Sequence, residues 1–254
     1  MIFEDPQLTV KVLTVNAHKG FTFFNRRFIL HELRDAVRAT GADIVFLQEV
    51  LGAHQGHASR VARWPTMSQY EFLADSIWQD FAYGRNAAYP YGHHGNALLS
   101  KFPIVRYSNL DVSVGKHEKR GLLHCVLQPP GFRSEVHAIC VHLGLRQTQR
   151  NRQTHLLCHL VSSEVPPDAP LVIAGDFNDW RLRTQDTLSR VDGIQEIFRA
   201  SQGQVARTFP ARFPFLRLDR IYVRNVIRFQ PIGLKGRPWS HLSDHAPLAA
   251  EVQL

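Results

Sequence analysis

The sequence predicts a single α+β domain in which two packed β-sheets are flanked by a few helices. Short apolar runs recur along the chain with short connections between them, and only a few segments have apolar residues at helical spacing. No internal repeat, low-complexity tract or long linker divides residues 1–254. Because the apolar faces of strands and helices must cover one another, many strands with few helices favour a layered fold.

Nine apolar runs predict the strands, and in the first of them the apolar residues include Val10, Val12 and Val15. The predicted strands cover residues 10–16, 44–48, 96–100, 121–127, 136–142, 171–176, 218–223, 226–229 and 248–252. Three helices are expected, over residues 28–40, 146–163 and 193–199. Gly41 is expected to end the first helix.

The composition is that of a folded globular protein, with 44% hydrophobic residues. The three cysteines form no CxxC pair, which indicates neither a disulfide framework nor a zinc site. The N-terminus has no basic segment before a long apolar run, and no window approaches the roughly 18 apolar residues of a membrane span. We therefore expect a cytoplasmic protein without a signal peptide.

The positive charge of the chain is concentrated in one segment. The net charge is +8, and residues 181–240 account for all of it with 12 Lys and Arg against 4 Asp and Glu. Such a basic block indicates a polyanionic partner, either nucleic acid or an anionic membrane surface. A solvated basic face without a partner would give the same count.

Polar residues close the apolar runs at positions where a purely structural strand requires none. They are Asn16, Glu49, His142, Asp176, Asn178, Asp219, Asp244 and His245. Strand ends gather along one edge of a layered fold, and functional sites grow there on the connecting loops. Each residue alone is weak, because a single Asn is often a turn residue and a single His is often structural.

Two spacings are more specific than any single residue. In the run GDFN, Asp176 and Asn178 are two residues apart, so in extended chain they project to the same side and can hold one oxygen-containing substrate. In the run SDH, neighbouring residues point in opposite directions, so Asp244 can face a metal while His245 faces a phosphate.

Seven motifs follow one another in a fixed order: TVNAHKG, DIVFLQEV, GNALLSKFPI, VHLGLR, AGDFNDW, LDRIYV and HLSDHAPL. In this order the chain resembles the endonuclease/exonuclease/phosphatase superfamily, which includes deoxyribonuclease I, the apurinic endonucleases, the sphingomyelinases and the inositol-polyphosphate phosphatases. The resemblance covers residues 10–252. Within the superfamily, the chain is similar to an uncharacterised bacterial branch. It implies a deoxyribonuclease I-like, four-layer α/β sandwich, which agrees with the apolar pattern.

The resemblance implies that Glu49 is the main Mg²⁺ ligand, supported by Asn16 and Asp244, with Mn²⁺ as an alternative ion. Mg²⁺ prefers one or two carboxylates together with waters and substrate oxygens, and Glu49 and Asp244 supply that number. In phosphodiester cleavage, charge develops on the phosphate oxygens and on the leaving alkoxide. A metal ion and cationic hydrogen-bond donors stabilise this charge.

By the same resemblance, Asp176 aligns and activates the attacking water, and Asn178 contacts the phosphate or the nucleophile. Asp219 and His245 resemble the family's Asp–His pair, in which the Asp holds the imidazole, raises its pKa and lets it donate to a phosphate oxygen. His142 matches the deoxyribonuclease version of a position that is Tyr in apurinic endonucleases. The motifs hold no nucleophile with a partner base, so direct attack by water is expected.

The sequence departs from the deoxyribonuclease pattern at one position. In that pattern a Glu ahead of the GNALLS-type strand supports the histidine matching His142, but here the stretch reads YGHHGN. The orientation of His142 therefore stays open. We expect Arg85, His93 and His94 to contact substrate phosphates, and a polar surface loop is the alternative.

A nuclease acting on DNA or RNA is the first functional hypothesis, because aromatic residues at 209, 213, 215, 222, 229 and 239 are interleaved with the basic block. Such interleaving suits backbone neutralisation with base stacking, although core packing is the alternative for several of these residues. Arg212 and Arg217 flank the run FPF just before Asp219 and are expected to bind substrate.

A phospholipid, sphingomyelin or inositol-phosphate phosphoesterase is the second hypothesis, with FPARFPF as a loop that inserts at an anionic membrane. A non-catalytic scaffold is the third, and the intact acidic and histidine positions argue against it. The choice among DNA, RNA and lipid, and between internal and end-directed attack, stays open at this point. No obligate protein partner is indicated, and we expect a monomer.

Overall fold

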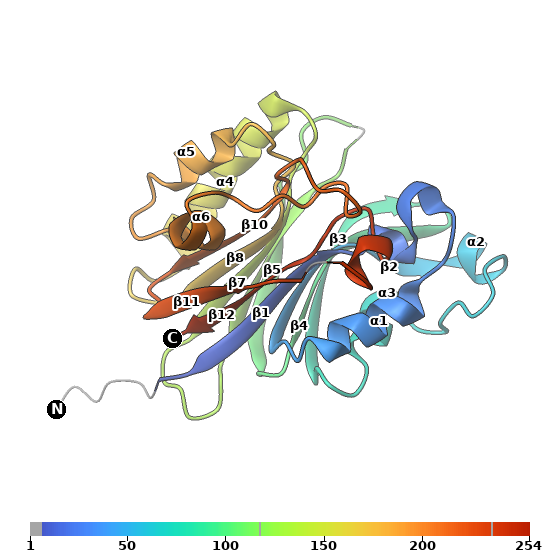
Figure 1. Cartoon of the computed structure of the whole chain (residues 1–254), viewed down its shortest axis with the longest axis horizontal. Coiled ribbons are helices and arrows are strands. Elements are labelled where there is room, and N and C mark those ends of the chain that lie inside the picture. The colour runs from blue at the N-terminus through green and yellow to red at the C-terminus, as the bar shows by residue number, and fades with distance from the viewer. Residues whose placement is uncertain (1–6, 117, 235) are drawn as a thin grey trace.

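Two six-stranded β-sheets pack face to face in the computed structural model, which describes residues 7–116, 118–234 and 236–254 (Figure 1). The strand order is β11-β12-β1-β2-β4-β3 in the first sheet and β5-β6-β7-β8-β10-β9 in the second. The first sheet contains β1 (Thr9–Asn16), β2 (Ile44–His54), β3 (Asp80–Tyr89), β4 (Gly92–Ser100), β11 (Arg228–Ile232) and β12 (Leu248–Gln253). The second contains β5 (Ile104–Asp111), β6 (Gly121–Leu127), β7 (Val136–His142), β8 (Leu171–Asp176), β9 (Gln195–Glu196) and β10 (Asp219–Arg224).

Helices cover the outer face of each sheet and complete the predicted four layers (Figure 1). The described helices are α1 (Leu30–Ala39), α2 (Gln55–Ala58), α3 (Gln69–Ala74), α4 (Gln147–Glu164), α5 (Arg183–Leu188) and α6 (Ile197–Gln202), with 3-10 turns η1 (His18–Gly20), η2 (Phe23–Asn25) and η3 (Trp239–His241). Leu30, Leu33 and Val37 recur at helical spacing, so α1 buries one stripe against the first sheet. None of the described helices is long and apolar enough to cross a membrane.

The central core lies between the two sheets. Val12, Phe46 and Leu98 of the first sheet pack in one cluster with Leu123 and Cys125 of the second. Helices cover the opposite faces of the same strands, so β6, β7 and β8 are buried along their whole length. Strands buried on both faces are apolar without alternation, which is why these runs were visible in the sequence.

Strand pairing fixes where the polar strand ends meet. β1 runs parallel to β2 with Asn16 opposite Gln48, and β7 runs parallel to β8 with His142 opposite Asp176. β10 runs antiparallel to β8 and places Asp219, its first residue, opposite Asp176. The Nδ2 of Asn16 lies 3.3 Å from a carboxylate oxygen of Asp176, so the strand ends of the two sheets gather at the same end of the sandwich.

The structure corrects three details of the expected elements. Strands β3 and β5 were not predicted, because both are edge strands with few buried side chains: β3 has two fully buried residues and β5 has none. Residues 193–199 were expected to form a helix but form β9 and the start of α6, since the Glu196 carboxylate accepts the Arg199 N–H at 2.6 Å and caps α6. β2 continues beyond Gln48 through a β-bulge.

Two buried histidines form a pair in the second sheet, away from the gathered strand ends. The Nε2 of His124 lies 2.9 Å from the Nδ1 of His137, and their rings are stacked. Burial lowers the pKa of both imidazoles, and the pKa of His137 falls to about 4. The ring of His137 is therefore neutral in the folded protein at mildly acidic pH, and burial opposes protonation of His124 as well.

We predict that this pair makes stability fall between about pH 6.5, the pKa of a histidine in the unfolded chain, and about pH 4. In this window the unfolded chain binds protons that the folded chain does not, so the free energy of unfolding decreases as the pH falls. The shift of the His137 pKa alone corresponds to about 3 kcal/mol of stability lost across this window. Chemical denaturation at a series of pH values measures it.

The double substitution His124→Gln with His137→Gln is expected to flatten this fall, because glutamine does not titrate. His159 lies exposed on α4, and His159→Gln is the matched control that should leave the fall intact. Equal pH dependence in the wild type and the double variant would contradict the prediction.

Candidate active site

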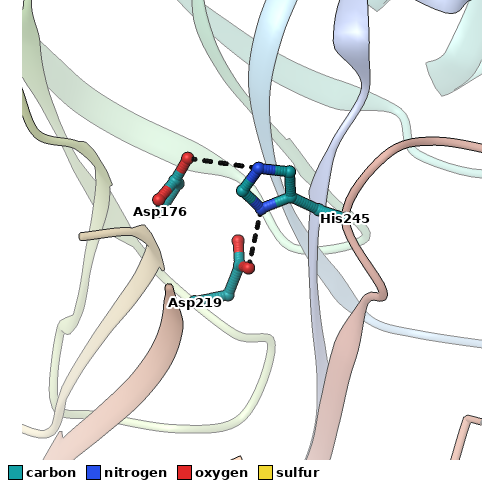
Figure 2. A group of neighbouring side chains, drawn as sticks. All are labelled: Asp176, Asp219 and His245. Atoms are coloured by element: carbon teal, nitrogen blue, oxygen red, sulfur yellow. Dashed lines mark hydrogen bonds and ion pairs between the residues drawn. The ribbon is translucent and has the colours of Figure 1, made fainter. Parts of the chain in front are cut away.

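Three buried side chains meet at the end of the sandwich where the strand ends gather (Figure 2). Asp176 ends β8, Asp219 begins β10, and His245 lies in the loop before β12. The Nδ1 of His245 is 2.9 Å from a carboxylate oxygen of Asp219, and its Nε2 is 3.8 Å from a carboxylate oxygen of Asp176. The imidazole is thus held between two carboxylates.

The protonation of this trio follows from its burial and its charges. Burial alone would lower the pKa of His245, but the charges of Asp219 and Asp176 outweigh it and raise that pKa to about 10. Burial raises the pKa of Asp176 to about 7, although the charge of His245 opposes the rise. The three groups lie within 4.8 Å of one another, a spacing that could hold a metal. In its protonated form the imidazole of His245 also offers Nε2–H as a donor to an oxyanion.

Asp176 accepts hydrogen bonds on both of its carboxylate oxygens. The backbone N–H of Asn178 donates to Oδ1 at 2.8 Å, and the Nδ2 of Asn16 donates to Oδ2 at 3.3 Å. Asn178 has a φ of 51°, and its own Nδ2 lies 3.4 Å from Oδ2. Asp176 and Asn178 therefore lie together as the sequence predicted, but a left-handed turn rather than extended chain brings them together.

A second acidic group lies beside the first and is open to solvent. Glu49 stands at the bulge of β2 with a φ of 53°, and Asp244 directly precedes His245. Their carboxylates lie 3.9 Å and 3.2 Å from the Nδ1 of His18, and their side chains are 23% and 14% exposed. A strained, non-glycine backbone such as that of Glu49 persists where its surroundings hold it, often at functional sites.

The residues of the second group fit a hard divalent cation. Glu49 and Asp244 converge on one point, and among the described residues neither has a Lys or Arg within 4.0 Å. Two carboxylates with solvent access match the donor set that Mg²⁺ uses. Asn16, the third predicted ligand, turns its amide oxygen to the backbone N–H of His18 at 3.1 Å. Since its Nδ2 faces Asp176, Asn16 links the two acidic groups, and its role as a ligand stays a prediction.

His18 was not found by the sequence analysis, although it follows a predicted ligand by two residues. Its φ of 42° is unusual for a non-glycine residue and places its ring between the two carboxylates of the second group. The Nε2 of His18 is buried without a hydrogen-bond partner among the described residues. The only local signal was the histidine itself in NAHKG.

His142 is fully enclosed at the end of β7, and its Nε2 lies 3.6 Å from Asp176. Burial lowers the pKa of His142 well below its usual value, and the charge of Arg120 lowers it further, so the ring is neutral. The stretch that lacks the supporting Glu contributes His94 to its surroundings instead. Asp176 is therefore the acidic neighbour of His142 among the described residues.

The predicted phosphate contacts from the YGHHGN region separate onto two faces of the first sheet. His94 lies on the face of the acidic groups, where the charge of Glu49 acts on its pKa. His93 lies on the other face and exchanges a hydrogen bond of 2.9 Å with the Tyr83 hydroxyl. Burial raises the pKa of the same Tyr83, and the charge of Arg85, which is exposed, opposes this rise. The structure therefore does not bring Arg85 and His93 to the acidic groups.

The loop of residues 209–217 lies directly against the two groups. The backbone N–H of Ala211 donates to the carbonyl of Asp244 at 2.7 Å, and the Phe209 ring packs 5.1 Å from the ring of His245. The loop is therefore attached to the segment that holds Asp244 and His245.

Arg212 and Arg217, the two predicted substrate-binding arginines, differ in how the loop holds them. Arg212 is exposed, and its guanidinium lies 5.6 Å from the centre of the Phe213 ring. Arg217 is half-buried and donates from Nε to the carbonyl of Val205 at 3.3 Å. Arg212 is thus the freer of the two to contact a substrate.

Aromatic side chains around the site divide into core and surface residues. Phe213 and Phe215 are 73% and 60% exposed, whereas Tyr222 is buried in the core. The sequence analysis missed a second exposed pair, Phe23 and Phe24, which belongs to the same region because Phe23 packs 6.2 Å from Phe209. We call Phe23, Phe24, Phe213 and Phe215 the aromatic rim.

The Endonuclease/Exonuclease/phosphatase family matches residues 13–245. The chain belongs to this family. The resemblance carried by the seven motifs is thereby confirmed, as is the fold that it implied. The family is a superfamily of metal-dependent phosphoesterases that includes nucleases.

Relatives and solved structures of the family agree with this assignment. The chain is 57% identical over 248 residues, covering 98% of each chain, to the uncharacterized protein YbhP of Escherichia coli strain K12. A family protein from Beutenbergia cavernae has a TM-score of 0.73 and 19% identity, over 97% of this chain and 72% of that one. TDP2 of D. rerio, solved with a single-strand DNA product, has a TM-score of 0.68 and 16% identity, over 96% of this chain and 98% of that one.

We predict for this family member that His245→Ala and Asp176→Asn each lower kcat by about two to four orders of magnitude, the range for positioned proton-transfer and electrostatic groups. Asp219→Asn should have a milder effect of the same kind, because it loosens the imidazole without removing it. If the two act as a pair, the double variant Asp219→Asn with His245→Ala is no slower than His245→Ala alone.

Steady-state rates with a phosphodiester substrate measure these effects, and circular dichroism establishes that each variant is folded. Asp192 is exposed beyond α5, and Asp192→Asn is the matched control that should keep wild-type turnover. Strictly additive losses in the double variant would show that Asp219 and His245 do not act together.

Proposed function

We propose that this chain is a Mg²⁺-dependent nuclease that hydrolyses phosphodiester bonds of DNA or RNA by direct attack of water. The observation that carries the proposal is the buried imidazole of His245, held between Asp219 and Asp176, beside the open carboxylate pair of Glu49 and Asp244. The first group offers a cationic donor to a phosphate oxygen. The second offers a place for a divalent cation.

The residues of the first group divide the work of hydrolysis. Asp176, whose pKa of about 7 leaves much of it ionised at neutral pH, orients a water molecule and accepts its proton. Asn16 and Asn178 hold this carboxylate in place through their hydrogen bonds. His245 donates from Nε2 to a non-bridging phosphate oxygen while Asp219 fixes its ring through Nδ1.

Glu49 and Asp244 would hold the metal ion of this site. Bound there, Mg²⁺ or Mn²⁺ would neutralise charge on the phosphate oxygens and on the leaving alkoxide. His18 lies between the two carboxylates and is expected to move aside or share the position, because its Nδ1 is as close as 3.2 Å to Asp244.

Nucleic acid is favoured as the substrate by the aromatic rim. Phe213 and Phe215 are exposed in the same loop as Arg212, so aromatic faces and a cation lie together beside the site. Such surfaces stack bases and neutralise the backbone of single strands. TDP2 of D. rerio, which shares the fold, holds a single-strand DNA product, so this fold accommodates such a ligand.

Part of the basic block is not available to a polyanion. Arg220 is buried and donates to the carbonyls of Arg217, Asp219 and Asp179. Arg224 is also buried and donates to the carbonyl of Pro166 at 2.8 Å. The net charge of this segment therefore overstates its positive surface, and the case for nucleic acid rests on exposed residues such as Arg212.

The alternative substrate is a phospholipid, sphingomyelin or inositol phosphate. The observation that favours it is the same aromatic rim, because Phe24, Phe213 and Phe215 are each at least 60% exposed next to the candidate site. Exposed apolar side chains with cations among them also suit insertion into an anionic membrane surface.

We predict that activity requires Mg²⁺ or Mn²⁺ and stops with excess chelator. Glu49→Gln should raise the metal concentration needed for half-maximal rate by about tenfold or more, because it removes one of two carboxylate ligands. Excess metal should then restore part of the rate. A metal titration of the wild type and the variant measures the shift.

Glu251 is exposed on β12, and Glu251→Gln is the matched control that should not change the metal titration. Full activity of the wild type in excess chelator, or an unshifted titration in Glu49→Gln, would remove Glu49 and Asp244 from a metal site.

If nucleic acid binds along the surface that holds Arg212, we predict that its affinity falls steeply with salt. Arg212→Gln should weaken the binding of single-stranded DNA or RNA and lower the slope of log affinity against log salt by about one, since one phosphate contact is lost. Binding titrations at several salt concentrations with labelled oligonucleotides measure the slope. Arg217→Gln should have a smaller effect, because its guanidinium is engaged with the protein.

Arg152 is exposed on α4, and Arg152→Gln is the matched control for the loss of one charge. The lipid alternative predicts the opposite pattern, in which Arg212→Gln weakens binding to anionic vesicles and leaves oligonucleotide affinity and its salt slope unchanged. That pattern would overturn the nuclease assignment in favour of the lipid one.

A further inference from the structure

A cavity of about 400 Å³ lies outside the two acidic groups, none of whose carboxylates line it. Its lining comes from η1, η2, β2, α2, β3 and β4, together with Phe21. The residues that give it its character are Lys19, His54, His57, His94, Phe21 and Tyr89. A volume of this size lies within the range of pockets that bind small ligands.

The donors of the cavity suit an anion. Among the described residues that line it none is acidic, while Lys19 and three imidazoles are present. The Nδ1 of His54 accepts the backbone N–H of His57 at 3.0 Å, so a neutral His54 carries its proton on Nε2 and can donate from there. The Nδ1 of His94 is buried without a hydrogen-bond partner among the described residues.

A metal does not fit these imidazoles. The one described group of three residues whose ligand atoms converge is that of Asp176, Asp219 and His245, which excludes His54, His57 and His94 as a convergent set. The ammonium of Lys19 would also repel a cation in the same cavity. Lys19 itself has no carboxylate within 4.0 Å among the described residues, so its charge is uncompensated.

The protein holds Lys19 in place through a buried glutamine. Lys19 has a φ of 56°, and its carbonyl accepts the Nε2 of Gln69 at 2.8 Å. The Oε1 of Gln69 accepts the backbone N–H of Leu51, another residue of the lining, at 3.0 Å. Gln69 is 1% exposed, so one enclosed side chain joins two walls of the cavity. A left-handed lysine fixed in this way is positioned rather than incidental.

Lys19 and His94 connect the walls of the cavity to the candidate active site. Lys19 directly follows His18, whose Nδ1 lies 3.9 Å from Glu49 and 3.2 Å from Asp244. His94 pairs with Leu51 just after the β-bulge that holds Glu49.

Burial lowers the pKa of His57 in the cavity and of His142 in the site, and the charge of Lys19 lowers both further. Glu49 acts in turn on the pKa of His94, which lines the cavity. One ammonium therefore lies within electrostatic reach of both places, and a ligand could extend from one to the other.

We propose that this cavity binds a second phosphate group of the substrate, next to the phosphate that is cleaved, with Lys19 as its counter-ion. The inference rests on the proposed phosphodiesterase function and specifies its substrate as a compound with two neighbouring phosphates. Lysine is a common point charge for phosphate, and the imidazole donors add hydrogen bonds. Phe21 and Tyr89 leave room for the sugar or ring that carries the phosphate.

Matched pairs of substrates test the proposal and identify the source of the phosphate. The nucleic-acid pair is the dinucleotide TpT with and without a 5′-phosphate, and the lipid pair is phosphatidylinositol 5-phosphate with and without the adjacent 4-phosphate, with release of the 5-phosphate as the measured reaction. In the pair that is cleaved, the additional phosphate should raise kcat/KM by about tenfold, which is the worth of one charge-assisted contact. Lys19→Gln should bring this ratio close to one, and Lys19→Arg should keep most of it.

Arg152→Gln on α4 is the control for the loss of one positive charge and should keep the wild-type ratio. A ratio near one in the wild type, or an unchanged ratio in Lys19→Gln, overturns the second phosphate site while cleavage of the substrates leaves the phosphodiesterase function in place. If the wild type cleaves neither pair, the proposed function fails instead. A direct measurement of phosphate binding then tests whether the cavity is a phosphate site. Calorimetric titration with inorganic phosphate in excess chelator should show about tenfold weaker binding in Lys19→Gln, and equal affinities overturn the site.

Discussion

The candidate site depends on one buried charge, the imidazolium of His245. Asp176 and Asp219 could not share this enclosed space as carboxylates without it, because like charges repel strongly where water is excluded. Removing one partner from such a buried set costs about 3–5 kcal/mol, so the ring is part of the fold as well as of the chemistry. Ser243, two residues earlier, anchors the loop by donating to the carbonyl at the end of β1 at 2.6 Å.

The same anchoring joins the chemistry to the surface that would meet a substrate. The hydroxyl of Thr208, which is fully buried, accepts the backbone N–H of Asp219 at 3.2 Å. On the other side of the loop, Ala211 donates to the carbonyl of Asp244. The beginning of the loop of residues 209–217 is therefore fastened both to the strand that holds Asp219 and to the segment that holds His245. Phe213 and Phe215 follow this anchored part of the loop by a few residues.

The sequence was sufficient for the layered fold, and a polar residue that closes a buried apolar strand is a local signal that located the ends of β1, β7 and β8. Glu49, predicted to end its strand, lies inside β2, because the strand continues through a bulge. The sequence was not sufficient for β3 and β5, whose edge positions leave few buried side chains. Nor could it find His18, since a left-handed turn after β1 directs that ring. The net charge of residues 181–240 overstated the positive surface, because a count does not show that Arg220 is buried and donates to backbone carbonyls.

The two cations at this end of the sandwich are placed differently, and that difference bears on recognition. His245 is compensated by two carboxylates, so it attracts an anion weakly from a distance and acts on an oxygen only when that oxygen is already in contact. Lys19 has no such partner among the described residues, so its charge is uncompensated and would attract an anionic substrate such as the proposed second phosphate. Attraction and chemistry are thus assigned to different residues. A substrate with one phosphate would have to leave the first cation to reach the second, whereas a substrate with two neighbouring phosphates could engage both at once.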